Sequence, residues 1–269
     1  MSKVIKLLHG LWLLVRKPYL INLILKDEQE LEAAFLKRFA QIKLQQIDVF
    51  EWPEAQNLEV KPYSFLSGSS LVTDFALLQL VCRKYQVQTY FEIGTWRGES
   101  AANVAPYVQN VYTLNLSATQ LQQLGASDAY IAAHRTFSKK ITNIQHLEGD
   151  SANFDLSPYL ASCDCIFIDG DHSYEAVKRD TQRMLSLRRD EQSILIWHDA
   201  KSDTEYPRFE VLRGIYEGLP VHMHQHVYLV KHTLCAIYLP GGHTSQAQAL
   251  HETPNKSFSL TLKQEVFQA

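Results

Sequence analysis

A short segment, FIDGDHSYE at 167–175, places acids and a histidine directly after an apolar run. Burying a charge without a partner is costly, so acids that follow a strand core usually lie at its exposed end. Asp169, Asp171 and His172 are therefore expected together at the end of a strand. Two interpretations are open. One is turn chemistry, since Asp and Gly favour loops in any protein and Asp171 could cap the next helix. The other is a reaction centre.

A second segment that could do chemistry is the glycine-containing loop EIGTWRGES. A dinucleotide-binding fingerprint needs G-x-G-x-x-G, but Trp96 and Glu99 stand at its second and third glycine positions. What remains is an E-x-G-x-x-x-G spacing of Glu92, Gly94 and Gly98. An acid two residues before the first glycine suits a ligand that carries positive charge, whereas a phosphate needs backbone amides facing an anion. Glycines that only make the turn are the alternative.

The elements that must position these segments alternate between strand and helix from about residue 70. Apolar runs predict five strands in QTYFEIG, VYTLNL, IQHLEGD, CDCIFIDGD and SILIWHDA. Helical spacing predicts helices in LVTDFALLQLVCRKY, ESAANVAPYV and YEAVKRDTQRMLSL, and a polar helical region over residues 119–140. Strands that alternate with helices of this length indicate βαβ units and a parallel sheet.

The pattern changes after Asp199. RFEVLRGIYEGL predicts a helix, and the strand-like runs VHMHQHVYLV and TLCAIYLP are joined by KHT alone. So short a connection requires an antiparallel hairpin. His222, His224 and His226 would share one face of the first of these strands, and a solvated or packed face is favoured over a metal site. Residues 241–269 predict a loose tail with at most one strand, in SFSLTL.

The composition is that of a globular protein, with 46% hydrophobic residues and a net charge of −3 among 269 residues. Near-neutral charge gives no general attraction to nucleic acid, so no nucleic-acid partner is expected. The four cysteines, Cys82, Cys163, Cys165 and Cys235, form no C-x-x-C pair. Buried thiols in a reducing, cytoplasmic setting are therefore predicted rather than disulfides or a zinc site. No G-x-S-x-G hydrolase motif occurs.

The N-terminal segment is basic and apolar. Residues 3–25 contain Lys3, Lys6, Arg16 and Lys17 and no acid, and the cations with Pro18 interrupt the apolar run short of a membrane span. Two interpretations are open: helices that pack on the domain or a twin subunit, and an amphipathic segment that makes peripheral contact with anionic lipid at the inner face of the membrane. Packing is favoured.

The two motifs together resemble those of a known family. E-I-G-T-x-x-G-x-S after the first strand, LEGDS, and I-D-G-D-H-S-Y-E after the fourth strand resemble class I S-adenosylmethionine-dependent methyltransferases, in particular the branch of macrocin O-methyltransferase and cephalosporin hydroxylase. The resemblance covers about residues 71–240. It implies a Rossmann-like, seven-stranded, mostly parallel α/β sheet with an antiparallel last strand and helices on both faces. We expect an extension at 1–60, the methyltransferase domain at 61–240 and a tail at 241–269.

The resemblance also implies a binding site for S-adenosylmethionine. The residues carried over are Glu92, Gly94, Thr95 and Gly98 for the methionine end, Ser100 behind them, Asn115 for the ribose, Asp150 and Ser151 for the adenine, and Asp169 beside the cofactor. The family has an acid where this chain has Asn115. Asn still accepts one hydrogen bond but loses the charge-assisted part, which is worth about 1 kcal/mol.

In the metal-dependent relatives, acids after the fourth and fifth strands hold Mg²⁺ or another divalent cation. The matching residues are Asp169, His198 and Asp199, and His198 departs from the carboxylate or amide oxygen of the family. Histidine favours softer ions such as Mn²⁺, Fe²⁺ or Zn²⁺, or His198 faces away and Asp199 binds alone. His172 matches the general base, and a neutral imidazole can accept a proton near neutral pH.

The function implied is O-methylation of a hydroxyl on a sugar, glycan precursor or secondary metabolite by a bacterial, cytoplasmic homo-oligomer. Two alternatives stay open. One is a cofactor-binding protein without catalysis, in which Asn115 and His198 are departures that mark lost activity. The other is metal-dependent chemistry of another kind, such as hydroxylation, on the same scaffold.

Overall fold

A computed structural model describes residues 2–21 and 28–266 of the chain. Two compact units divide it, Met1–Ile42 and Lys43–Ala269. The first contains α1 (Lys3–Arg16), the 3-10 helix η1 (Pro18–Leu20) and α3 (Glu28–Arg38). The basic segment predicted over residues 3–25 is thus mostly helical where it is described, and its last four residues lie outside the described residues.

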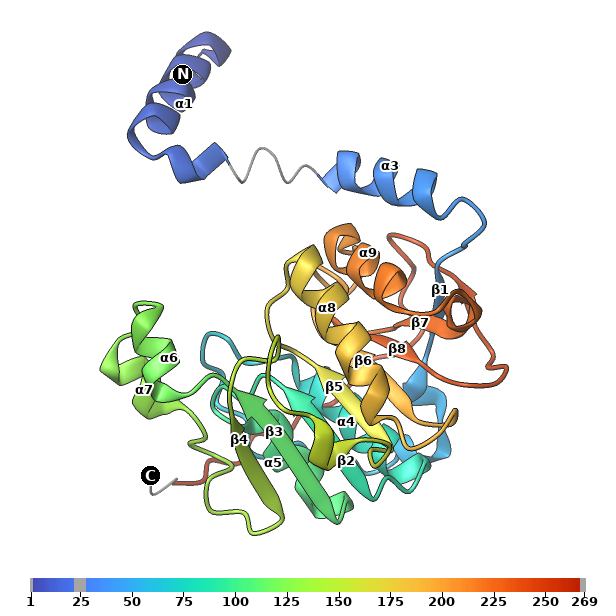
Figure 1. Ribbon diagram of the computed structural model, residues 1–269. Helices are drawn as coiled ribbons and strands as arrows, with labels where there is room; N and C mark the ends of the chain where they lie inside the picture. The colour runs from blue at the N-terminus through green and yellow to red at the C-terminus, as the bar shows by residue number, and fades with distance from the viewer. Residues whose placement is uncertain (1, 22–27, 267–269) are drawn as a thin grey trace. The chain divides into compact units, whose positions relative to one another are not determined.

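The second unit is built on one sheet with the strand order β4-β3-β2-β5-β6-β8-β7-β1-β9 (Figure 1). Strands β2 to β6 pair in parallel, and β8 is antiparallel to β6 and β7. The strands are β1 (Gln45–Ile47), β2 (Thr89–Ile93), β3 (Asn110–Asn115), β4 (Ile144–Glu148), β5 (Cys165–Ile168), β6 (Ile194–Trp197), β7 (Val227–Val230), β8 (Ala236–Tyr238) and β9 (Gln246–Ala247). The predicted fold class and the antiparallel hairpin are confirmed.

The sheet has two strands more than the seven predicted. β1 pairs in parallel with β7, and β9 pairs antiparallel with β1. Without β1, the outer edge of β7 would present a row of unpaired backbone N–H and C=O groups. Parts of the predicted N-terminal extension, β1, and of the predicted tail, β9, therefore belong to the sheet.

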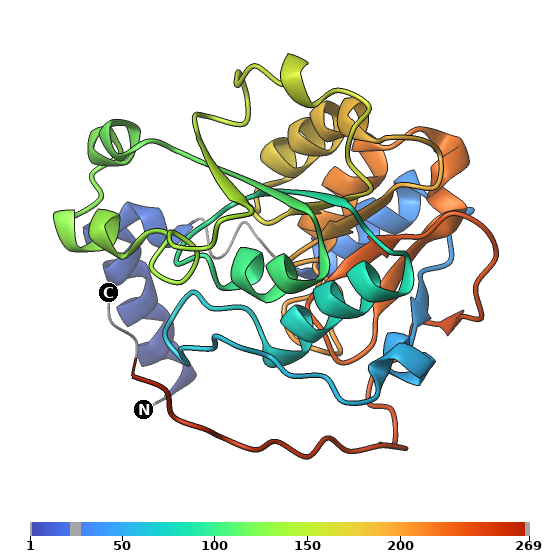
Figure 2. The same cartoon turned by 90° about the horizontal axis from the view of Figure 1, so that it is seen from below.

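Helices cover both faces of this sheet, as predicted. α8 and α9 pack against each other on one face, and α4 and α5 pack on the other (Figures 1 and 2). The helices are α4 (Val72–Lys84), α5 (Glu99–Val104), α6 (Ala118–Gln123), α7 (Asp128–Ala133), α8 (Tyr174–Met184) and α9 (Phe209–Gly218). Every residue of β2, β5 and β6 is buried, and β5 and β6 accordingly have continuous apolar sequences, CIFI and ILIW.

One local prediction is wrong, and the structure adds detail to two others. Residues 221–226 form a 3-10 helix, η7 (Val221–His226), so the three alternating histidines are not on a strand. Pro220 precedes this turn, and extended pairing begins only at Val227. SFSLTL forms no strand, and the polar region at 119–140 holds two short helices, α6 and α7. The prediction that the cysteines are buried thiols is confirmed for all four.

Candidate active site

The two chemical motifs meet where the strand order reverses. β2 pairs with β3 on one side and β5 on the other, and ligands in open parallel sheets bind beyond the carboxyl ends of the strands at such a point. A cavity of about 850 Å³ lies there. The predicted residues that line it are Gly94, Thr95, Gly98, Ser100, Asn115, Asp150, Ser151, Asp169 and His172.

Gly94 brings the loops after β2 and β5 into contact. Its φ is +96°, and a Cβ added there would lie 1.9 Å from the carbonyl oxygen of Asp169. Gly98 is similar, with φ +79° and a built Cβ 2.0 Å from the Ser138 Oγ. Both positions therefore need glycine for conformation and for space. The two glycines therefore form the turn, and their lack of side chains allows the close backbone approach at the cavity wall.

Glu92 does not line the cavity, contrary to the prediction. It is fully buried in β2 and accepts a hydrogen bond from the Tyr90 hydroxyl at 3.0 Å. Residues two apart share a strand face, so Tyr90 and Glu92 point to the same buried side. Burial raises the pKa of Glu92 to about 7, although hydrogen bonds from Thr113, Ser100 and Tyr90 oppose the shift. This buried position does not support a contact between Glu92 and the cofactor.

Asn115 and Ser151 are held at the cavity wall by hydrogen bonds. The Asn115 Oδ1 accepts a long hydrogen bond from the Thr95 backbone N–H at 3.5 Å, which links the ends of β3 and β2. The Ser151 hydroxyl donates to Asp180 at 2.9 Å. Asp171 also lines the cavity, and its Oδ1 accepts from the Ser173 N–H at 2.7 Å at the start of α8. Asp171 thus makes the turn contact that its alternative interpretation predicts.

The acids and histidines after β5 and β6 form one cluster. The His172 Nε2 lies 3.0 Å from the Asp199 Oδ2. The His198 Nδ1 lies 3.2 Å from the Asp169 Oδ1 and 3.4 Å from the Asp199 Oδ2. The neighbouring strand ends therefore place all four side chains together, as the sequence predicted.

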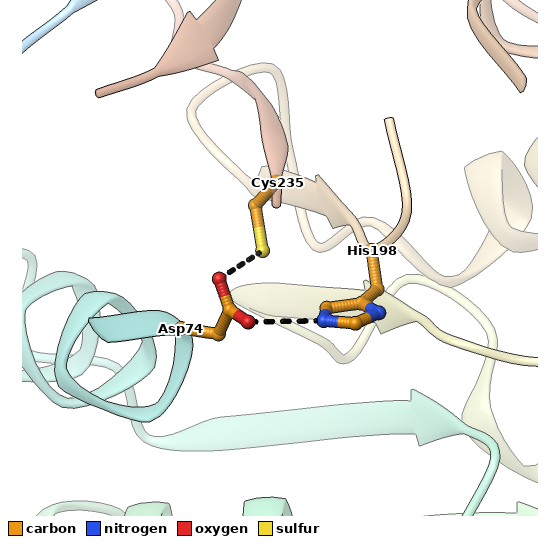
Figure 3. Close-up of side chains that lie close together, drawn as sticks. All are labelled: Asp74, His198 and Cys235. Atoms are coloured by element: carbon orange, nitrogen blue, oxygen red, sulfur yellow. Dashed lines mark hydrogen bonds and ion pairs between the residues drawn. The ribbon is translucent and has the colours of Figure 1, made fainter. Parts of the chain in front are cut away.

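Asp74 completes this cluster, and the sequence analysis missed it. Figure 3 shows its carboxylate between His198 and Cys235. Asp74 is fully buried, and its Oδ2 lies 3.1 Å from the His198 Nε2. It also accepts hydrogen bonds from the backbone N–H groups of Leu71 and Leu234. The available signal was a single acid within the apolar helix LVTDFALLQL.

Asp74 fixes which way the His198 ring faces. With Nε2 held by Asp74, Nδ1 points toward Asp169 and Asp199. A carboxylate behind a histidine is the arrangement that orients imidazole ligands in metal sites. Of the two alternatives for His198, the one in which its ring faces away from the acids is therefore excluded.

The cluster concentrates opposite charges. Burial lowers the pKa of His198, but the carboxylates around it outweigh burial and hold that pKa well above its ordinary value. The hydrogen bond to Asp199 raises the pKa of His172, against a smaller opposing effect of burial. Burial would raise the pKa of Asp199, yet hydrogen bonds to the two histidines hold it far below its ordinary value. Positive charge is thus favoured at this position.

The donor atoms of this cluster fit a divalent cation. One donor atom each from Asp169, His172 and Asp199 lie within 4.8 Å of one another. In the set that the resemblance implies, the His198 Nδ1 lies 3.2 Å from an Asp169 oxygen and 3.4 Å from an Asp199 oxygen, close to the spacing of about 3 Å between adjacent ligand atoms of an octahedral ion. Imidazole nitrogens in the set favour Mn²⁺, Fe²⁺ or Zn²⁺ over Mg²⁺.

An aromatic group lines the cavity, and the sequence analysis missed two of its members, Tyr130 and His134. Trp96 has φ +42°, and its ring lies 4.1 Å from that of Tyr130 and 4.9 Å from that of His134. The Arg97 guanidinium lies over the Trp96 ring at 4.5 Å. All four residues line the cavity. Spacing gave no signal for Tyr130 and His134, because they come from α7 and the residue that follows it. Trp197, by contrast, is buried in the core.

Comparison with known proteins identifies the domain that contains this cavity. Residues 91–200 match the family model of a methyltransferase domain. Residues 91–200, less than half of the chain, are thus similar to a methyltransferase domain. This segment runs from β2 through the His198–Asp199 pair, so it includes the glycine loop and the charged cluster. The match agrees with the predicted enzyme class, a methyltransferase, and with S-adenosylmethionine as its cofactor.

Solved structures of similar fold include three bacterial proteins. The YcgJ protein of Bacillus subtilis is 16% identical, with a TM-score of 0.34 over 47% of this chain and 52% of that chain, so the match spans about half its length. A Klebsiella pneumoniae protein proposed to be an O-methyltransferase is 15% identical, with a TM-score of 0.45 over 65% and 84%. A Staphylococcus aureus protein proposed to be a caffeoyl-CoA O-methyltransferase is 20% identical, with a TM-score of 0.43 over 84% and 100%. No curated protein matches this chain.

Proposed function

We propose that this methyltransferase acts on oxygen, transferring a methyl group from S-adenosylmethionine to a hydroxyl of a sugar, glycan precursor or secondary metabolite. The observation that carries the proposal is the position of His172. Its imidazole lies at the cavity wall, paired with Asp199 at 3.0 Å. A hydroxyl must lose its proton as it attacks the methyl group, and a positioned imidazole supplies the base.

The residues of this chain have separate parts in the reaction. The backbone around Gly94 and the side chains of Asn115 and Asp150 bind and orient the cofactor, so that donor and acceptor align for in-line displacement. Asp199 holds the His172 Nε2, which leaves Nδ1 as the nitrogen that takes the proton. The carboxylate of Asp199 then stabilises the imidazolium that forms.

Asp169, His198 and Asp199 would hold a divalent cation, as the resemblance implies. When bound, such an ion lowers the pKa of a coordinated hydroxyl and supplies positive charge beside the acceptor oxygen. Asp74 would act behind His198 by fixing its ring, and its carboxylate would raise the basicity of the imidazole.

The narrower assignments belong to the same proposal. The motifs support the branch of macrocin O-methyltransferase and cephalosporin hydroxylase and, with it, a bacterial enzyme. The buried free cysteines support a reducing, cytoplasmic setting. We also propose a homo-oligomer, by the family resemblance alone. A binding protein without catalysis is less well supported, because a base, its orienting acid and a cofactor cavity are all present.

Binding of S-adenosylhomocysteine tests the cofactor part of this proposal. Isothermal titration should show saturable binding at one site per chain, with and without chelator, because the cofactor contacts do not involve a cation. A parallel titration of chelator-treated protein with Mn²⁺ should also show binding, weakened in Asp169→Asn. NADH binding without S-adenosylhomocysteine binding would exclude this cofactor, and absence of Mn²⁺ binding would remove the cation from the account.

A further inference from the structure

The first helix of the chain exposes an apolar face. α1 has no buried residue, and seven large apolar side chains on it are each at least half exposed. They are Val4, Ile5, Leu7, Leu8, Leu11, Trp12 and Val15. At about 100° per residue, these positions fall within one half of the helix circumference. Single exposed apolar residues need no explanation, but a continuous face of seven does.

The opposite side of α1 carries Leu13 and Leu14, and all of its charged residues are positive. Lys3, Lys6 and Arg16 lie on the helix, Lys17 follows it, and no acid occurs in residues 2–21. Trp12 lies at the boundary between the two faces, where the Arg16 guanidinium lies 4.7 Å from its ring centroid. An indole next to a cation at such a boundary is typical of residues at the level of lipid headgroups.

The length of α1 limits how it could meet a bilayer. Among the described residues, no helix has the length and apolarity needed to cross a membrane. A helix of 14 residues with separate apolar and basic faces can instead lie in the plane of the interface. There the apolar face enters the headgroup and acyl boundary while the cations stay among the headgroups.

We propose that α1 is a docking helix for a membrane surface that contains anionic lipids. Charge decides between this partner and a second copy of the chain. Pairing two copies of α1 through their apolar faces would leave the cations Lys3, Lys6, Arg16 and Lys17 of each copy on the outer sides of the pair, with no acid in residues 2–21 to offset their charge. Anionic headgroups supply the missing negative charge.

Sedimentation of the full-length protein with vesicles tests this proposal. Vesicles of phosphatidylcholine with phosphatidylserine should bind the protein, vesicles of phosphatidylcholine alone should bind it weakly, and added salt should weaken binding. Each cation near an anionic surface contributes about fivefold in affinity, so Lys3→Gln with Lys6→Gln should weaken binding about 25-fold.

Two exposed valines provide a matched pair of variants for the apolar face. Val15 is 82% exposed on α1, and Val221 is 75% exposed in η7. Val15→Asp should weaken vesicle binding on the order of 50-fold or more, because the side chain no longer enters the lipid and its charge is repelled. Val221→Asp should bind as the wild type does. Far-ultraviolet circular dichroism and thermal unfolding should be unchanged in both variants.

Two results would overturn the proposal. The first is equal binding to neutral and anionic vesicles, which would remove the basic face from the interaction. The second is absence of vesicle binding, with a wild-type dimer in size-exclusion chromatography that Val15→Asp dissociates. That result would assign the apolar face to a subunit interface.

Discussion

His172→Ala should lower the rate of methyl transfer by about 10²–10⁴-fold, the usual contribution of a general base. The variant should still bind S-adenosylhomocysteine, because the imidazole is placed on the acceptor side of the donor sulfonium in our proposal. The rate would be measured as formation of S-adenosylhomocysteine in the presence of acceptor. His222→Ala is the matched control, since His222 is exposed in η7 and does not line the cavity.

The dependence of the methyl-transfer rate on pH should differ between the wild-type enzyme and His172→Ala. His172 accepts a proton only when neutral, so the wild-type rate should rise as pH rises through its pKa. Asp199 raises that pKa above the ordinary value, which moves the rise to higher pH. In His172→Ala this step should disappear, and rising pH should recover activity only as the acceptor hydroxyl ionises unaided. Full activity of His172→Ala at every pH would show that His172 is not the base and that the segment around it only forms a turn.

Gly94→Ala should reduce the affinity for S-adenosylhomocysteine by more than about 100-fold, through displacement of a loop that lines the cofactor site. The new Cβ would lie 1.9 Å from the Asp169 carbonyl oxygen, so the loops after β2 and β5 must separate. The carbonyl oxygen is part of the backbone and the Cβ position is fixed by the backbone, so neither atom can rotate away. The measurements are isothermal titration and thermal unfolding, since loss of the close contact should also lower the midpoint of unfolding.

Gly241→Ala is the control for this variant. Its φ is +87°, close to that of Gly94, but a built Cβ meets no atom within 4 Å. It should therefore cost only the strain of a left-handed alanine, about 1–2 kcal/mol, and leave the cofactor affinity unchanged. Equal cofactor affinity in the two variants would show that the close approach of the two loops does not shape the site.

Much of the site could be predicted because it depends on rules that act along the chain. CIFI and ILIW are apolar throughout, so they predict buried parallel strands, and adjacent parallel strands end at the same edge. That is enough to bring Asp169 close to His198 and Asp199. Asp74 could not be predicted in this way, since it lies 124 residues before His198 and reaches it through the packing of α4.

The remaining errors have local physical causes. Strand periodicity places Glu92 on the same face as Tyr90, but the sequence does not say which face meets the cavity. β1 and β9 contain three and two residues, too few to show a period of two. The alternating histidines of VHMHQH suggest a strand, whereas the residues form a 3-10 helix after Pro220.

The central claim is that the cavity transfers a methyl group from S-adenosylmethionine to a hydroxyl oxygen. The most direct measurement is mass spectrometry of reactions that contain the protein, isotopically labelled S-adenosylmethionine and a panel of hydroxylated sugars, glycan precursors and secondary metabolites. The account predicts S-adenosylhomocysteine together with a product one methyl group heavier, with the label on oxygen. Binding of S-adenosylhomocysteine without turnover of any hydroxyl acceptor, or a label found on nitrogen or carbon, would contradict it.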